Sequence, residues 1–131
     1  MKKFWSGLLI VCLLLVFSGC SSSNETDDLT MDKFIEAFNN SGEDISSGMS
    51  SDEKDFVDKE KKPMYQMIGA KDGVIFDIGK DVVKLYEYES NAKIKKAVKS
   101  FDPLMEDWPI RGKFILETHN EKAIEIFNNV K

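Results

Sequence analysis

One cysteine near the beginning of the chain stands where a covalent modification is expected. Cys20 directly follows a serine and a glycine, and residues 8–17 before them form an unbroken apolar run. Two lysines near the first residue place positive charge ahead of that run. A basic head, an apolar centre of roughly 7–15 residues and small residues at its end are typical of a secretory signal peptide. The pattern therefore predicts that residues 1–19 direct export and are then removed.

The cysteine makes this signal peptide a special case. The run Phe17-Ser18-Gly19-Cys20 resembles the bacterial lipobox, whose cysteine is acylated and then becomes the mature N-terminus. Phe17 stands where an aliphatic residue is usual. One acyl chain holds a protein to a bilayer reversibly, whereas the two chains of a diacylglyceryl group hold it stably. We therefore expect lipidation at Cys20 and a location on the extracytoplasmic face of the cell membrane.

Two alternatives to lipidation arise from the same residues. An uncleaved transmembrane anchor needs ~20 apolar residues, which is more than residues 8–17 supply. Ordinary secretion would leave Cys20 as a structural thiol. The chain has 2 cysteines, and Cys12 lies inside the signal peptide, so Cys20 has no disulfide partner after processing. An unpaired cysteine in an exported protein needs an explanation, and lipidation supplies one.

The other residues that could carry chemistry do not combine into a recognisable site. His119 is the single histidine, whereas a zinc site needs three or four ligands. Several acidic residues lack the alternating spacing and the glycine of a calcium loop, and we expect them to form a solvated face: Asp52, Glu53, Asp55 and Asp58. Three glycines fall in expected hairpin turns rather than in a phosphate loop: Gly69, Gly73 and Gly79. We therefore expect no metal, no cofactor and no enzymatic activity.

Four aromatic residues form the candidate binding patch. Tyr65, Tyr86, Tyr88 and Trp108 combine an apolar ring with a polar group, and Tyr86 and Tyr88 share one side of a predicted strand. Side chains of this kind are enriched in recognition surfaces. The alternative is that they close the predicted sheet over a helix as part of the core.

The composition excludes one large class of partner. The formal net charge is −5, and removal of the two signal-peptide lysines makes the remainder more acidic. Nucleic acid is therefore not an expected partner, because phosphate binding requires a basic surface. One basic row is expected to be the solvated face of a helix, with contact to an anionic polymer or headgroup as the alternative: Lys93, Lys95, Lys96 and Lys99.

Apolar spacing predicts three helices. Thr30 is expected to cap the first, which ends before Gly42, and Ser90 or Asn91 is expected to cap the second. Thr118 is followed at three residues by glutamate, the spacing of a capping box, ahead of the third. The expected buried stripes are Met31, Phe34, Ile35 and Phe38, then Ile94, Ala97, Val98 and Phe101, then Ala123, Ile126, Phe127 and Val130.

Alternating and β-branched residues predict strands between these helices. Residues 64–68, 74–78 and 82–88 are expected to form a three-stranded antiparallel meander, and residues 111–118 a further strand. The last strand of the meander carries apolar side chains on both sides. One face of the sheet is therefore expected to be covered fully and the other in part.

These elements predict one α+β domain, a small antiparallel sheet of three to four strands packed by two to three helices on one face. Residues 43–51 are expected to form a loop or a short edge strand, and residues 52–62 a short helix that the following proline ends. The domain is expected to span residues 30–131, behind the signal peptide of residues 1–19 and a lipidated, flexible tether over residues 20–29.

Several short motifs resemble a family of small, uncharacterised lipoproteins of Gram-positive bacteria. The motifs are Met67-Ile68-Gly69-Ala70, Asp72-Gly73, Val83 through Tyr86 with Tyr88, Gly112-Lys113-Phe114, Leu116-Glu117-Thr118 and Glu125-Ile126-Phe127. The resemblance covers roughly half of the chain and implies a compact α+β domain on a lipid anchor. It implies no activity, and the lipidated Cys20 is the one functional residue that it carries over.

The leading hypothesis is a lipid-anchored, extracytoplasmic binding module that recognises an envelope protein or polymer. An envelope-acting hydrolase or transferase is one alternative, and a structural or stress-response lipoprotein is another. A deep pocket with convergent polar groups would favour an enzyme. An exposed aromatic patch beside the sheet would favour partner binding. The sequence predicts neither the ligand nor the oligomeric state.

Overall fold

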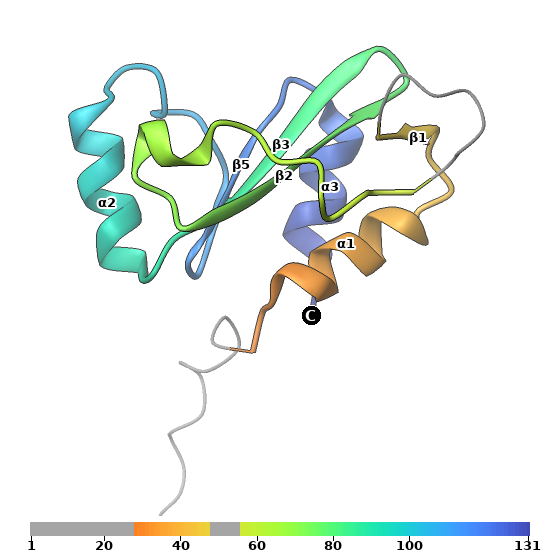
Figure 1. Ribbon diagram of the computed structural model, residues 1–131, viewed down its shortest axis with the longest axis horizontal. Helices are drawn as coiled ribbons and strands as arrows, with labels where there is room; N and C mark the ends of the chain where they lie inside the picture. The colour runs from red at the N-terminus through yellow and green to blue at the C-terminus, as the bar shows by residue number, and fades with distance from the viewer. Residues whose placement is uncertain (1–27, 48–55) are drawn as a thin grey trace, which may run out of the picture.

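A computed structural model describes residues 28–47 and 56–131 of the chain (Figure 1). Within these residues the elements are α1 (Met31–Asn39), β1 (Ile45–Ser46), the 3₁₀-helix η2 (Tyr65–Ile68), β2 (Asp72–Ile78), β3 (Asp81–Glu87), α2 (Asn91–Ser100), β4 (Ile110–Arg111), β5 (Phe114–Glu117) and α3 (Glu121–Asn129). The strands form one antiparallel sheet in the order β1-β2-β3-β5-β4. The predicted α+β class is confirmed, with five strands in the described sheet rather than three to four.

The prediction that residues 64–68 form the first strand of a meander is wrong. Tyr65–Ile68 form η2 instead, with Met64 as its N-cap and Gly69 at its end in the left-handed conformation, φ 80°. The edge of β2 that this segment would have joined is already occupied. Ile45 and Ser46 of β1 pair with its end, and the Ile75 amide donates to the Lys61 carbonyl at 3.0 Å. A short apolar segment without a free strand edge beside it cannot form strand hydrogen bonds. A tight helical turn pairs its backbone amides and carbonyls instead.

Two further predictions near the sheet need correction. Gly73 lies inside β2 rather than in a hairpin turn. A Cβ at this position would come within 3.1 Å of the Pro63 ring and of the Leu85 carbonyl oxygen, so close packing explains the glycine. The strand predicted for residues 111–118 is divided into β4 and β5 by a turn at Gly112, whose φ is 59°.

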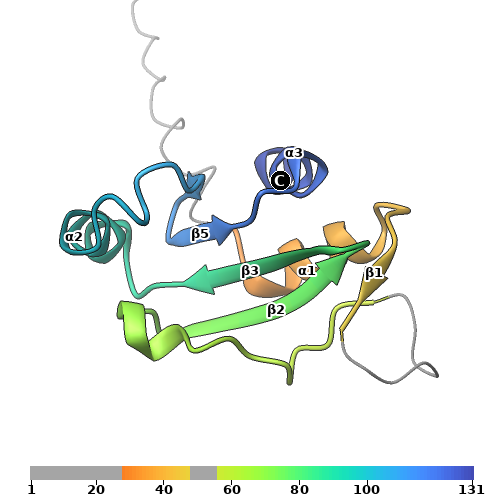
Figure 2. The same cartoon turned by 90° about the horizontal axis from the view of Figure 1, so that it is seen from above.

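The central strand β3 separates two hydrophobic cores. Val83 and Leu85 point to the first core, which α1 and α3 cover, whereas Tyr86 and Tyr88 point to the second, which α2 covers. The helices therefore lie on both faces of the sheet, whereas the sequence predicted all of them on one face. Figure 2 shows α2 at one end of the sheet, away from α1 and α3. The expectation that one face is covered fully and the other in part is confirmed.

Phenylalanine rings dominate the first core. The Phe34 ring of α1 lies 4.8 Å from the Phe114 ring of β5 and 5.0 Å from the Phe127 ring of α3, measured between centroids. Phe38 meets Phe76 of β2 at 4.9 Å in an edge-on arrangement. These contacts join both helices to two of the strands, and Phe34 takes part in two of the three ring pairs.

The helix caps follow the predictions in two of three cases. The side chains of Thr30 and Ser90 accept hydrogen bonds from backbone amides at the starts of α1 and α2. The third cap is Asn120 rather than Thr118, because its Oδ1 accepts from the Ala123 amide at 2.8 Å. Thr118 has another role: its hydroxyl donates to the Val82 carbonyl at 3.1 Å and so closes the end of the β3–β5 pair.

The buried residues of the described part begin at Leu29. Leu29, which the sequence placed in the tether, is buried in the first core beside α1. Among residues 28–47 and 56–131, the members of the two cores run from Leu29 to Val130 and form a substantial apolar interior. Within that part, no helix is both long and apolar enough to span a bilayer. The predicted signal peptide, Cys20 and most of the predicted tether lie outside the described residues.

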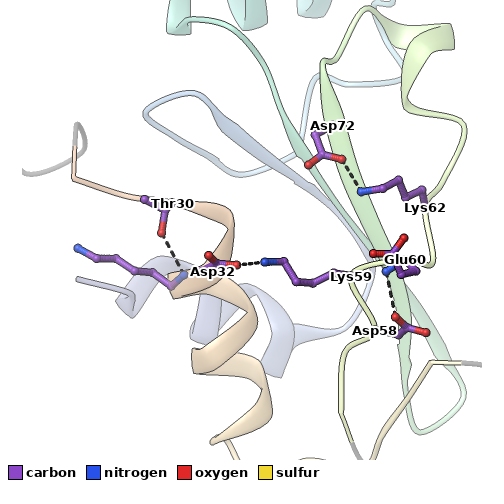
Figure 3. Close-up of polar contacts among 8 residues, drawn as sticks. Thr30, Asp32, Asp58, Lys59, Glu60, Lys62 and Asp72 are labelled. Atoms are coloured by element: carbon purple, nitrogen blue, oxygen red, sulfur yellow. Dashed lines mark hydrogen bonds and ion pairs between the residues drawn. The ribbon is translucent and has the colours of Figure 1, made fainter.

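The segment of residues 56–63 is an extended strap rather than the end of a helix. Figure 3 shows Lys59 reaching Asp32 at the start of α1, and Lys62 reaching Asp72 at the start of β2, the second pair at 2.7 Å. Asp58, directly before Lys59, accepts a hydrogen bond from the Glu60 amide at 2.9 Å and forms a turn. The strap therefore joins the first core to the edge of β2. The remaining acids of the predicted solvated face lie outside the described residues.

Truncation of the central ring tests the first core. Phe34→Ala is expected to lower the free energy of unfolding by about 3–5 kcal/mol, because the cavity would remove the contacts of Phe34 with two other rings. Glu36→Ala, at an exposed position of the same helix, is the matched control and should change it by less than about 0.5 kcal/mol. Urea unfolding measures both. Equal effects of the two variants would contradict this account of the core.

Candidate functional site

The four aromatic residues of the candidate patch do lie together, but two of them are not on the surface. Tyr86 and Tyr88 are buried in the second core, and Tyr65 and Trp108 pack against its edge with part of their surfaces exposed. The patch as predicted is therefore wrong for Tyr86 and Tyr88. Strand alternation predicts which side a residue takes, but not whether a helix will cover that side.

Tyr88 fastens η2 to the sheet. Its hydroxyl donates to the Ile68 carbonyl oxygen at 2.6 Å, across the second core from β3. Burial raises the pKa of Tyr88 to about 12. The hydroxyl therefore stays protonated over the whole physiological range and acts as a permanent donor.

Tyr86 instead links the second core to the open surface beyond it. Its ring stacks on the Trp108 ring with 6.1 Å between centroids and 8° between planes. Its hydroxyl donates to the Glu117 carboxylate at 3.0 Å, and the Lys84 ammonium lies 3.1 Å from the other carboxylate oxygen. Burial, and then the negative charge of Glu117, raises the pKa of Tyr86. The group therefore has a neutral phenol, a carboxylate and an ammonium in fixed positions.

The strand register places this group at the middle of an uncovered part of the sheet. Lys84 pairs with Glu117, and Tyr86 pairs with Ile115, which in turn pairs with Ile110. Because alternate residues of a strand share a face, the uncovered part of the second face can be assigned from these pairs. We call it the open sheet face, and it consists of Ile75, Asp77, Val82, Lys84, Ile110, Glu117 and the edge of Trp108.

The open sheet face is more apolar than a solvated surface needs to be. Val82 is 49% exposed and Ile110 is 40% exposed, at the two ends of the strip. Between them the Lys84 and Glu117 side chains keep about a third of their surface accessible, 32% and 30%. An exposed strip of apolar groups around a fixed polar centre is a typical arrangement for contact with another molecule.

The remaining chemical candidates are dispersed over the structure. His119 is exposed at the junction between β5 and α3. Within residues 28–47 and 56–131, no three histidine, cysteine, aspartate or glutamate side chains gather as a metal site would require. Asp58 is the one described member of the predicted acidic face, and its carboxylate forms the turn in the strap.

Two surface hollows lie beside α3, away from the aromatic residues. One, of about 320 Å³, opens between α1 and α3 and includes Ala37, Glu125 and Ile126 in its lining. The other, of about 400 Å³, is lined by Lys33, Arg111 and residues near the end of α3. Arg111 already donates to two carbonyls there, those of Phe127 at 2.9 Å and Val130 at 2.6 Å, so its guanidinium serves to hold α3.

The sequence missed Val82, Ile110 and the Lys84–Glu117 pair. Each of these residues is unremarkable by itself, since isolated apolar or charged surface residues are common. Lys84 and Glu117 are separated by 33 positions and meet through the register of β3 with β5. The alternation of the predicted strands was the one available signal, because it placed Tyr86 and Tyr88 on a common side, which is the side that Val82 shares.

Comparison with known proteins identifies no relative. A scan against protein families, a search of curated proteins and a search of solved structures each returned no match. The resemblance to small Gram-positive lipoproteins therefore stays a prediction from the motifs. The predicted lipidation of Cys20 also stays a prediction, because this residue lies outside the described part of the chain.

The burial of Tyr88 predicts a loss of stability at alkaline pH. Its pKa is about 12 in the folded protein and ~10 in an unfolded chain. A raised pKa means that its contribution is fully present below pH ~10 and is lost as the pH rises through about 12. Urea unfolding at pH 8, 10 and 11 should therefore show falling stability, and the fall should be smaller in Tyr88→Phe.

The same variant tests the hydrogen bond at neutral pH. Tyr88→Phe is expected to cost about 1 kcal/mol, because the Ile68 carbonyl loses its donor. Tyr65→Phe is the matched control, since the Tyr65 ring packs at the edge of the same core. The interpretation fails if Tyr88→Phe has the wild-type alkaline slope and the wild-type stability.

Proposed function

We propose that this chain is a lipid-anchored, extracytoplasmic binding module. Lipidation at Cys20 would hold it on the membrane, and the open sheet face would contact a protein or polymer of the cell envelope. The proposal combines the signal peptide and lipobox pattern of residues 1–20 with the surface chemistry of the described domain. It assigns anchoring to the N-terminal segment and recognition to the sheet.

The observation that carries the binding function is the chemistry of the open sheet face. Val82 and Ile110 expose apolar surface at its ends, and the Trp108 edge adds an aromatic group beside them. Removing such surface from water stabilises a complex in proportion to the apolar area that is covered. Trp108 has little freedom to lose on binding, because its ring already stacks on Tyr86.

The polar centre of the face would provide specificity. The Glu117 carboxylate accepts hydrogen bonds from the Tyr86 hydroxyl at 3.0 Å and from the Lys84 ammonium at 3.1 Å. The group is therefore organised before a partner binds. A partner that covers this pair must offer hydrogen-bonding groups in return, because an unsatisfied buried charge is costly. We expect the partner to combine an apolar group near Ile110 with a polar group over Glu117.

The anchor can be tested by mass spectrometry of the intact chain recovered from bacterial membranes. The wild-type protein is expected to begin at Cys20 and to carry the added mass of a diacylglyceryl group. Cys20→Ala should lack that mass, because it has no thiol to acylate. Cys12→Ala, a matched cysteine change inside the signal peptide, should be lipidated normally. An unmodified Cys20 in the wild-type protein would refute the anchor.

The binding face can be tested by photo-crosslinking in intact cells. A photoreactive residue at Val82 is expected to give a discrete adduct, because this position is exposed on the open sheet face. A second substitution, Ile110→Ser, should reduce the adduct at least about fivefold, since it removes apolar contact area from the same strip. The control places the photoreactive residue at Glu36 of α1, which is exposed on the opposite side of the sheet.

The outcomes separate the hypotheses that the sequence left open. An adduct from Val82 but not from Glu36 supports a binding module and identifies its partner. Equal adducts from both positions, or none from either, contradict recognition by this face. A structural lipoprotein without a ligand would give the second result, whereas the loss of an adduct on addition of a small substrate would indicate an enzyme.

A further inference from the structure

The outer face of α2 concentrates positive charge that the fold does not use. Its residues Lys93, Lys95, Lys96 and Lys99 are all exposed, and the helix contains no acidic residue. Lys99 lies four positions from Lys95 and three from Lys96, a spacing at which like charges destabilise a helix. Within the described part of the chain, none of the four is in an ion pair. Contacts inside the domain therefore do not account for this row.

The turn beside α2 exposes two methionines. Met64 is 75% exposed and Met67 is 68% exposed, the highest values among the large apolar side chains of the described residues. Their neighbours Tyr65 and Ile68 pack inward against the second core, so η2 directs the methionines outward. Figures 1 and 2 both show η2 alongside α2 at the same end of the molecule. We call the outer lysines of α2 together with Met64 and Met67 the α2–η2 face.

Acidic residues lie near both ends of α2, and Glu89 is exposed just before its cap Ser90. Asp102, Glu106 and Asp107 are exposed in the segment that follows the helix. Figure 2 places η2 and this segment at different levels of the view, both on the side of α2 that faces the sheet. This end of the domain therefore carries exposed charge of both signs, and the acidic segment also exposes Leu104, at 61%. The α2 lysines and the exposed Met64 and Met67 combine positive charge with protruding apolar groups, a composition suited to contact with an anionic layer.

We propose that the α2–η2 face lies on an anionic phospholipid bilayer. The methionine side chains enter the boundary between headgroups and acyl chains, and the α2 lysines contact the lipid phosphates. Basic residues combined with protruding apolar side chains are the two components of interfacial binding. The contact is distinct from the open sheet face, which remains available for a partner.

The covalent structure favours a bilayer over an acidic protein as the occupant, and this step rests on the proposed anchor at Cys20. Residues 21–27 separate Cys20 from the first described residue. At most ~3.6 Å per residue, they allow a reach of about 25–30 Å, which is comparable to the size of the domain. A domain so close to the bilayer meets it at a high effective concentration, so a weak second contact suffices to orient it.

The surface can be tested apart from the anchor by vesicle sedimentation. The probe protein is residues 20–131 with Cys20→Ser, which carries no lipid and retains both cores. It is expected to bind vesicles containing phosphatidylglycerol and to bind phosphatidylcholine vesicles at least about tenfold more weakly. The binding to anionic vesicles should weaken as salt is added, because lysine–phosphate attraction is screened.

Two variants separate the contributions of charge and apolar surface. Lys95→Gln/Lys96→Gln/Lys99→Gln should lower binding by about tenfold or more, and Met64→Ser/Met67→Ser should lower it severalfold at all salt concentrations. The matched control, Lys80→Gln/Lys122→Gln/Lys131→Gln, changes the net charge equally on exposed lysines elsewhere and should have a smaller effect. All substituted side chains except Met67 and Met64 are charged surface groups, and circular dichroism checks the fold of each variant.

The results distinguish an anionic bilayer from an acidic protein as the molecule that contacts the α2–η2 face. Absence of binding to anionic vesicles, or equal losses in the control and the α2 lysine variant, overturns the proposal. A photoreactive residue at Met67 that captures a protein instead of lipid in cells also overturns it, in favour of an acidic partner. Because the probe lacks the lipid, failure here leaves the Cys20 and Val82 experiments unaffected, and an unmodified Cys20 leaves the vesicle result interpretable.

Discussion

The whole structure depends on a central strand that must bury both of its faces. β3 directs Val83 and Leu85 into one core and Tyr86 and Tyr88 into the other. A shift of one residue in its pairing with β2 or β5 would exchange every one of these side chains. The strand therefore determines the register of its neighbours. Its two apolar faces must both be covered by other segments of the chain.

The two cores meet this requirement unequally. On the first face, α1 and α3 bring large aromatic rings together around Phe34. On the second, α2, η2 and the segment before β4 cover the end of the sheet that carries Tyr86 and Tyr88. The tyrosines suit this position because a buried ring can still extend its hydroxyl to a polar partner at the boundary. The Tyr86 hydroxyl reaches Glu117, and the Tyr88 hydroxyl reaches the backbone of η2.

Because other segments cover the two faces of the sheet unequally, some of its surface stays exposed and could bind another molecule. Where α2 ends, the sheet exposes apolar and charged groups around the Lys84–Glu117 pair. Where η2 closes the second core, its short turn buries Tyr65 and Ile68 in part and leaves the methionines outside. The strap across β2 protects the opposite edge through Lys62 and Asp72. Burial alone would raise the pKa of Asp72, but hydrogen bonds from Lys62 and the Gly73 amide outweigh it and hold the pKa below its usual value.

Local patterns in the sequence determined much of the architecture. The spacing of Phe34 and Phe38 predicted a buried helical stripe, and alternation predicted a strand over residues 74–78, as the structure confirms. Thr30 and Ser90 were recognisable as caps because the interaction spans three residues. Each of these signals is short in range, so the amino-acid order alone contains it.

The predictions that failed depended on contacts between distant segments. Residues 64–68 have the composition of a strand, but β1 and the strap already occupy the edge that they would have joined. Gly73 has the appearance of a turn residue, but it is required by the approach of Pro63.

The sequence by itself therefore determined the α+β class, the helices, the two-sided character of β3 and the pattern that predicts lipidation at Cys20. The tertiary structure alone decided that Tyr86 and Tyr88 are buried, that Lys84 meets Glu117, and which apolar side chains remain exposed. The physical reason is that local spacing specifies which side of an element is apolar, whereas the packing of other segments decides whether that side is covered.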